Sequence, residues 1–202
     1  GGIVHRHTNN NNNNKSSGGG GSGGPPRSAY RQMLTSHQTW AMMLLWFSAS
    51  LVYYGISLAA SVLSHGIPLV ASASLSALCE VPAALFSSYV LEHRSLGRRR
   101  STWMLYALGG VCCVSLPLFP SAAAPVAAIL GKFFITTAFD GIYVYATEVF
   151  STEVRGAALG LCSSCARVGA IVAPQALAGL STARVMQLFG GSALLAAVAC
   201  AG

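Results

Sequence analysis

Residues 125–149 read PVAAILGKFFITTAFDGIYVYATEV, and this stretch decides the fold class of the chain. It is long enough to cross a bilayer as a helix, which takes about 20 predominantly apolar residues. Lys132 and Asp140 lie inside the stretch, where a charged side chain is costly unless it is paired or faces water. The stretch therefore predicts a transmembrane helix that carries two functional candidates.

Apolar blocks of similar length lie on both sides of this stretch. They cover about residues 40–63, 68–91, 103–119, 157–180 and 185–202, and we expect the last to be cut short. A membrane β-barrel would need segments of about ten residues with alternating polarity, which these blocks lack. Hydrophobic residues make up 53% of the chain and charged residues 8%, against about 25% charged residues in soluble domains. The sequence predicts an all-α, polytopic membrane helix bundle over residues 31–202 and excludes a soluble enzyme.

The first 30 residues differ in composition from the rest. They contain an Asn tract at 9–14 and a Gly/Ser/Pro-rich stretch at 16–26, which cannot bury enough apolar surface to fold. We predict that residues 1–30 form a disordered cytoplasmic tail or central loop. The chain has no initiator Met, so we expect it to start inside a longer protein.

The distribution of Lys and Arg predicts the orientation. With one helix per block, the joints on the side of the tail carry nine basic residues and the opposite joints carry only Arg184. Cytoplasmic loops are enriched in Lys and Arg, so the N-terminal tail is predicted to be cytoplasmic, and we expect a multi-pass protein of the plasma membrane. The formal charge of +7 then follows from topology and needs no nucleic-acid partner. Anionic lipid is an additional candidate partner for the arginines at 94–100.

Glu80, Lys132, Asp140 and Arg167 all lie within the apolar blocks. At 1.5 Å per residue, Glu80, Asp140 and Arg167 fall roughly 13–17 Å from the inner edge, which is the middle of the membrane. Such residues mark substrate or ion pathways by default. The alternative is that Asp140 or Glu80 pairs with Arg167 only to hold the bundle together. No nucleophile and base stand together in the sequence, so we expect neither an enzyme nor a cofactor or metal site.

Several motifs resemble, in order, those of one known family, the organic cation, anion and carnitine transporters of the major facilitator superfamily. They are Trp46-Phe47 with Tyr53 to Leu58, Glu80-Val81-Pro82-Ala83, Gly131-Lys132-Phe133 with Tyr143 to Phe150, and Ser151 to Gly156 with Arg167-Val168-Gly169. The resemblance covers about residues 31–180 and matches the C-terminal six-helix half of that fold. It implies transport of a small organic ion by alternating access, together with an N-terminal six-helix half that this chain lacks.

The resemblance also implies two sets of functional residues. The candidate substrate-binding residues are Arg167, Asp140, Glu80, Lys132 and Tyr143. The candidate gating motif at the cytoplasmic helix ends consists of Glu92, Arg94, Arg98, Arg99, Glu148 and Arg155, although the acid before the arginines is displaced by two positions from the family pattern. The resemblance at Arg167 further implies a carboxylate-bearing or zwitterionic substrate, to which a guanidinium offers two parallel hydrogen bonds. A sugar or phosphate porter of the same superfamily and a non-transporting membrane protein fragment are the alternatives.

Overall fold

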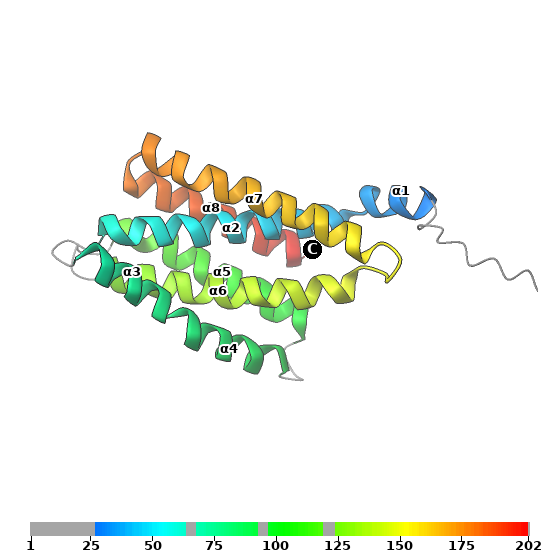
Figure 1. The fold of residues 1–202 in the computed structure, drawn as a ribbon, viewed down its shortest axis with the longest axis horizontal. Helices are drawn as coiled ribbons and strands as arrows, with labels where there is room; N and C mark the ends of the chain where they lie inside the picture. Colours follow the sequence, from blue (N-terminus) through cyan, green and yellow to red (C-terminus); the bar gives the residue numbers. More distant parts are fainter. Residues whose placement is uncertain (1–26, 64–67, 93–96, 119–123, 202) are drawn as a thin grey trace, which may run out of the picture.

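The computed structural model describes residues 27–63, 68–92, 97–118 and 124–201, and every regular element within them is a helix (Figure 1). The elements are α1 (Arg27–Thr35), α2 (His37–Leu63), α3 (Leu69–Leu78), α4 (Glu80–Glu92), α5 (Arg98–Ser115), the 3₁₀ turn η1 (Leu116–Leu118), α6 (Ala124–Val149), α7 (Arg155–Gly179) and α8 (Thr182–Ala201). The predicted all-α membrane bundle is confirmed. In this part of the chain, α2, α5 with η1, α6, α7 and α8 are long and apolar enough to cross a membrane.

The predicted span at 68–91 is broken into two helices. The chain turns at Cys79, between α3 and α4, so neither piece reaches the length of a membrane span. Pro82 explains the position of the break, because its ring clashes with the carbonyl of residue 78 and its nitrogen has no proton to donate. The N-terminal boundary also differs from the prediction, since α1 begins at Arg27 and includes residues 27–30. The rest of the predicted tail lies outside the described residues.

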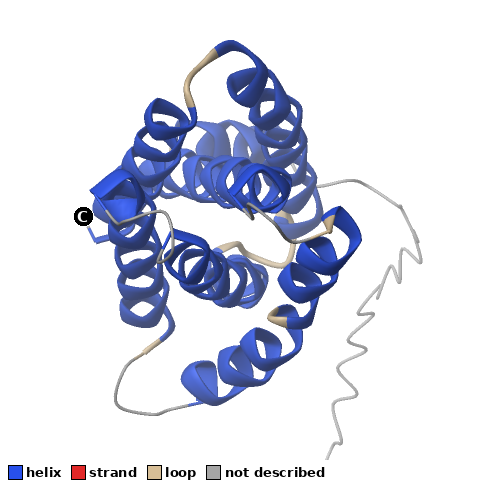
Figure 2. Ribbon diagram, turned by 90° about the vertical axis from the view of Figure 1, so that its left-hand side faces the viewer, coloured by secondary structure: helices blue, strands red, loops and turns tan. Residues whose placement is uncertain are grey.

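The centre of the bundle is α2, which packs against α6, α7 and α8, while α5 packs against α6 and α8. Figure 2 shows most of the helices nearly end-on, so their axes lie roughly along the length of the bundle. Trp46 and Ile56 of α2, Ile135 of α6 and Phe189 of α8 are almost completely buried between them. The Tyr106 hydroxyl donates a hydrogen bond to the Leu45 carbonyl at 2.7 Å, which ties α5 to α2.

Glycine permits the close crossing of α5 and α8. A Cβ atom at Gly190 would lie 2.6 Å from the carbonyl oxygen of Gly110. Small residues at such crossings let membrane helices pack closely, because van der Waals contact replaces the hydrophobic effect there. The two helices that carry no charge within their predicted spans, α5 and α8, therefore pair with each other behind α2 and α6 in the view of Figure 1.

The predicted alternation of the joints agrees with the structure. Arg98 at the start of α5 pairs with Glu148 near the end of α6, with Nε and Oε1 2.8 Å apart. Arg99 donates hydrogen bonds to the carbonyls of Cys200 and Ala201, in the last turn of α8. Figure 1 shows the starts of α2 and α7 at this same end of the bundle. We call it the arginine end, and its cytoplasmic location stays a prediction.

Candidate functional site

Lys132 is the one buried charged residue in the described part of the chain. Its ammonium nitrogen lies 2.8 Å from Glu80 Oε1 and donates hydrogen bonds to the hydroxyl and carbonyl oxygens of Ser76, at 2.8 and 3.0 Å. The Tyr53 hydroxyl donates to the same Glu80 oxygen at 2.7 Å. Because an ammonium group has three protons to donate, all of them are used. We call these four residues the Lys132 network.

The helix break at Cys79 creates the Lys132 network. Ser76 lies in the last turn of α3, where carbonyl groups have no partner within the helix. The Lys132 ammonium from α6 binds this carbonyl on one side of the break and the Glu80 carboxylate, the first residue of α4, on the other. Lys132 therefore holds the two halves of a discontinuous helix together. In transporters, discontinuous membrane helices typically carry substrate and ion sites.

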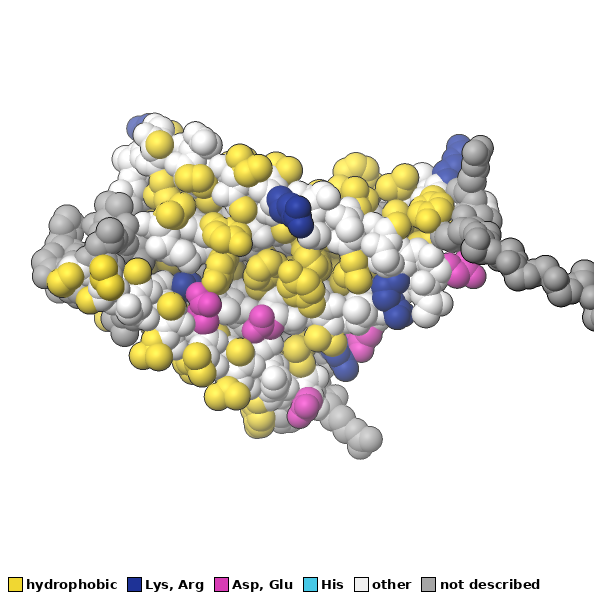
Figure 3. All heavy atoms as spheres, viewed as in Figure 1, with side chains coloured by type: hydrophobic (Ala, Val, Ile, Leu, Met, Phe, Trp, Pro, Cys, Tyr) yellow, Lys and Arg dark blue, Asp and Glu magenta, His cyan; other side chains and the backbone are white. Residues whose placement is uncertain are grey.

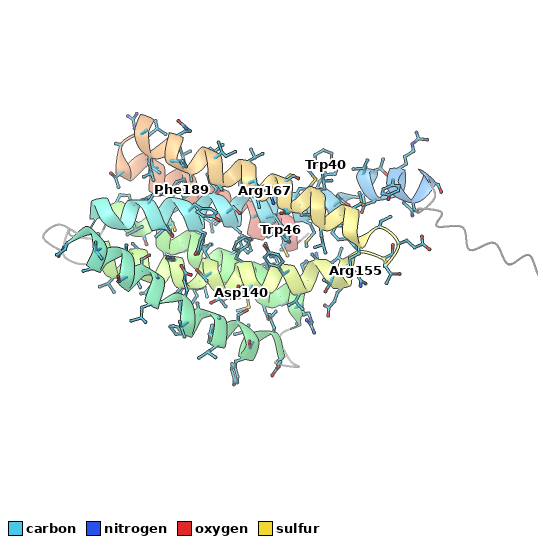
Figure 4. The ribbon with its side chains drawn as sticks, viewed as in Figure 1. Trp40, Trp46, Asp140, Arg155, Arg167 and Phe189 are labelled. Atoms are coloured by element: carbon cyan, nitrogen blue, oxygen red, sulfur yellow. The ribbon has the colours of Figure 1, made fainter. Side chains whose placement is uncertain are left out.

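Asp140 and Arg167 are exposed and make no ion pair within the described part of the chain. The alternative of a structural pair with Arg167 is not seen among the described residues, because Glu80 pairs with Lys132 and Asp140 makes no ion pair there. Figure 4 shows Asp140 on α6 and Arg167 on α7, with Trp46 of α2 between them. Two ionisable groups thus stand on the same side of the bundle without neutralising each other.

An aromatic cluster separates these two charges. The Trp46 ring lies 4.4 Å from the Tyr143 ring and 6.2 Å from the Phe139 ring, measured between centroids. Tyr143 is half exposed, whereas Trp46 is buried and its indole nitrogen has no hydrogen-bond partner among the described residues. Tyr53, through its contact with Phe139, extends the cluster to the Lys132 network. An aromatic surface between a carboxylate and a guanidinium suits a small organic ion with an apolar body.

The face that carries these groups is largely apolar. Figure 3 shows hydrophobic side chains across it, with a few acidic and basic side chains among them. Large exposed residues on this set of helices include Tyr54, Val81, Leu85, Val168 and Ile171. Contiguous apolar surface of this kind marks a contact with protein or lipid.

The residues of the predicted gating motif are partly brought together. Arg98 and Glu148 form the ion pair described above, Arg99 binds the end of α8, and Arg155 donates to the Phe150 carbonyl at 3.3 Å. Glu92 ends α4 and makes no ion pair with a described residue, and Arg94 lies outside the described residues. Arginines therefore join the ends of α5, α6 and α8.

Sequence reasoning identified Glu80 and Lys132 but missed Tyr53 and Ser76 as members of their network. The signal for Tyr53 was a hydroxyl in an apolar block, and the signal for Ser76 was its place just before a Glu-x-Pro motif. Neither signal indicates a partner, since the partners come from different helices.

Comparison of the sequence with known proteins shows which family the chain matches. The family model described as Major Facilitator Superfamily matches residues 3–174. Solute carrier family 22 member 15 of Xenopus tropicalis is 35% identical over 154 residues, which cover 72% of this chain and 28% of that protein. The human organic cation/carnitine transporter 2 is 36% identical over 134 residues, covering 65% of this chain and 23% of the transporter.

A third relative, the synaptic vesicle 2-related protein of Rattus norvegicus, is 30% identical over 207 aligned positions, covering 86% of this chain and 37% of that protein. The chain thus spans between 23% and 37% of the lengths of these three relatives.

Proposed function

Because this chain belongs to the major facilitator superfamily, we propose that it forms one half of a membrane carrier for a small organic ion. The expected resemblance to organic cation and carnitine transporters is confirmed by the relatives. In our proposal the carrier works by alternating access, with an N-terminal six-helix half as the second wall of a central site.

The observation that carries this proposal is that Asp140 and Arg167 are exposed on membrane-spanning helices and make no ion pair with a described residue. A charged side chain facing lipid at mid-membrane costs about 2.5–3.5 kcal/mol or more. Protein or water must therefore cover this face in a membrane. A second half that closes over a water-filled cavity meets this requirement and leaves both charges free to bind a solute.

The chemistry of the two charges indicates the substrate class. Arg167 offers a guanidinium to a carboxylate, and Asp140 offers a carboxylate to an ammonium group. The exposed ring of Tyr143 packs on the buried Trp46 ring and offers an aromatic surface to the apolar body of a solute. A zwitterion or a carboxylate-bearing ion suits this arrangement, in agreement with the carnitine in the name of one relative, the human organic cation/carnitine transporter 2.

The test uses a chimera in which residues 37–201 replace the matching segment of the human organic cation/carnitine transporter 2. Uptake of labelled carnitine is measured per molecule at the cell surface. We expect Arg167→Asp to lower uptake at least about tenfold, because a charge-assisted contact is lost and repulsion replaces it. Arg184→Asp, the same change at an exposed position in the first turn of α8, is the matched control and should leave uptake unchanged.

The double variant Asp140→Arg/Arg167→Asp separates binding from structure. Since the two side chains do not touch, we expect the swap to leave uptake low. Restored uptake would show instead that the two residues act as an ion pair. Unchanged uptake in the Arg167→Asp chimera at normal surface level would remove Arg167 from the site, and an inactive parent chimera at the surface would contradict the proposed carrier half.

A further inference from the structure

A small cavity lies at the arginine end, between α2, α5, α6 and α8. Its volume is about 100 Å³, which is room for a few water molecules or one compact polar group. His37, Gln38 and Arg99 are exposed at its rim, whereas Met42 and Leu45 are buried in its apolar floor. The cavity is separate from the proposed transport face, since Asp140, Arg167 and the Lys132 network do not line it.

Among the described residues, the Arg and His side chains that line this cavity meet no acidic one. Arg99 and His37 belong to its lining, and no Asp or Glu of the described residues does. Hydrogen bonds from Nε and Nη2 to the carbonyls of Cys200 and Ala201, at 2.7 and 2.8 Å, hold the Arg99 guanidinium in place. A guanidinium has five N–H protons, so three remain for another acceptor. The hydroxyl of Tyr145, which also lines the cavity, is a further donor.

We propose that this cavity binds the phosphate group of an anionic membrane lipid. A positioned arginine with spare donors is the group best suited to phosphate oxygens. The ends of membrane helices lie at the depth of the lipid head groups, and the predicted cytoplasmic leaflet is the one rich in anionic lipid.

Two neighbouring arginines give a matched test of this site. Arg99 lines the cavity, whereas Arg100 carries the same charge on the same turn of α5, is exposed and does not line it. The purified chain in detergent micelles is titrated with phosphatidic acid and, separately, with phosphatidylcholine, and its thermal unfolding midpoint is followed. Ligand that binds only the folded state raises the midpoint and yields an apparent affinity.

We expect phosphatidic acid to raise the midpoint of the parent chain and phosphatidylcholine to leave it unchanged. Arg99→Gln should weaken the apparent affinity for phosphatidic acid about tenfold, and Arg100→Gln less than about twofold, because only the first removes a charge-assisted hydrogen bond. Equal weakening by both variants would reveal diffuse attraction of charge and would overturn the proposal.

Arg99 also holds the end of α8, so Arg99→Gln alone is open to a folding defect. His37→Gln leaves the Arg99 hydrogen bonds intact and should still weaken binding of phosphatidic acid, by about threefold. An unchanged affinity in His37→Gln would count against the cavity. If inorganic phosphate at the same concentrations raised the unfolding midpoint of the parent chain as much, the cavity would bind a free anion, and the proposed lipid site would be wrong.

Discussion

At the residue scale, the environment of Lys132 explains why a charged side chain is stable inside this bundle. A buried ammonium group is costly unless its protons are bonded and its charge is paired. Lys132 meets both conditions through Glu80 and Ser76, although the Glu80 side chain itself is 36% exposed. The partners are therefore unequal, because water can solvate the carboxylate but not the ammonium.

This inequality predicts different costs for removing each partner. Glu80→Gln leaves a buried cation without its counter-ion and should destabilise the purified chain by up to about 3 kcal/mol, the low end for breaking a buried pair because Glu80 is partly exposed. Lys132→Met should cost less, and the double variant should recover most of the loss. Thermal or denaturant unfolding in micelles measures all three. Additive losses in the double variant would show that the two side chains do not interact.

At the element scale, one proline lies inside a continuous helix and another follows a helix break. α7 continues through Pro174, as membrane helices often do, whereas the chain turns at Cys79, shortly before Pro82. The two sites differ in what binds the backbone carbonyls that have no partner within the helix. At the break, the Lys132 ammonium donates a hydrogen bond to the Ser76 carbonyl. A side chain from another helix therefore stabilises the interruption.

The close crossing of α5 and α8 gives a prediction about neighbouring glycines. Gly190→Ala would place a methyl group against the Gly110 backbone and should destabilise the chain by about 1–3 kcal/mol, as overpacking does. Gly191→Ala is the control, since a Cβ there meets nothing within 4 Å. Unfolding of the purified variants measures the difference. Equal stability of the two variants would mean that the helices do not cross as closely as described.

At the scale of the whole molecule, the bundle is one-sided. α5 and α8 pair with each other, while Asp140 and Arg167, which make no ion pair with a described residue, lie on the face shown in Figure 3. Alternating access requires two such faces that rock about a shared site. In the proposed carrier, this chain supplies one of them.

We therefore expect residues 1–202, reconstituted without any partner half, to show no saturable uptake of carnitine or of simple organic cations. The chimera described above is the positive control, measured in vesicles of the same composition. Saturable uptake by the chain alone would contradict the need for a second half and would point to assembly of copies of this chain.

The sequence alone was sufficient for the fold class and for most of the helices. Long apolar blocks predict transmembrane helices because the bilayer demands internal backbone hydrogen bonding, whatever the neighbours are. The same argument identified Glu80, Lys132, Asp140 and Arg167, since a charge in an apolar block stands out in any fold. The motifs of the loops and helices also indicated the family, which the comparisons confirmed.

Only the tertiary structure decided which charges pair. Membrane helices are apolar on all sides, so their periodicity does not indicate which face meets which neighbour. The ion pair of Glu80 with Lys132, rather than with Arg167, depends on α4 lying beside α6. The break at Cys79 likewise depends on a partner from α6 that binds the freed carbonyl of Ser76. Sequence determines which residues need partners, and the packing of helices determines which partners they find.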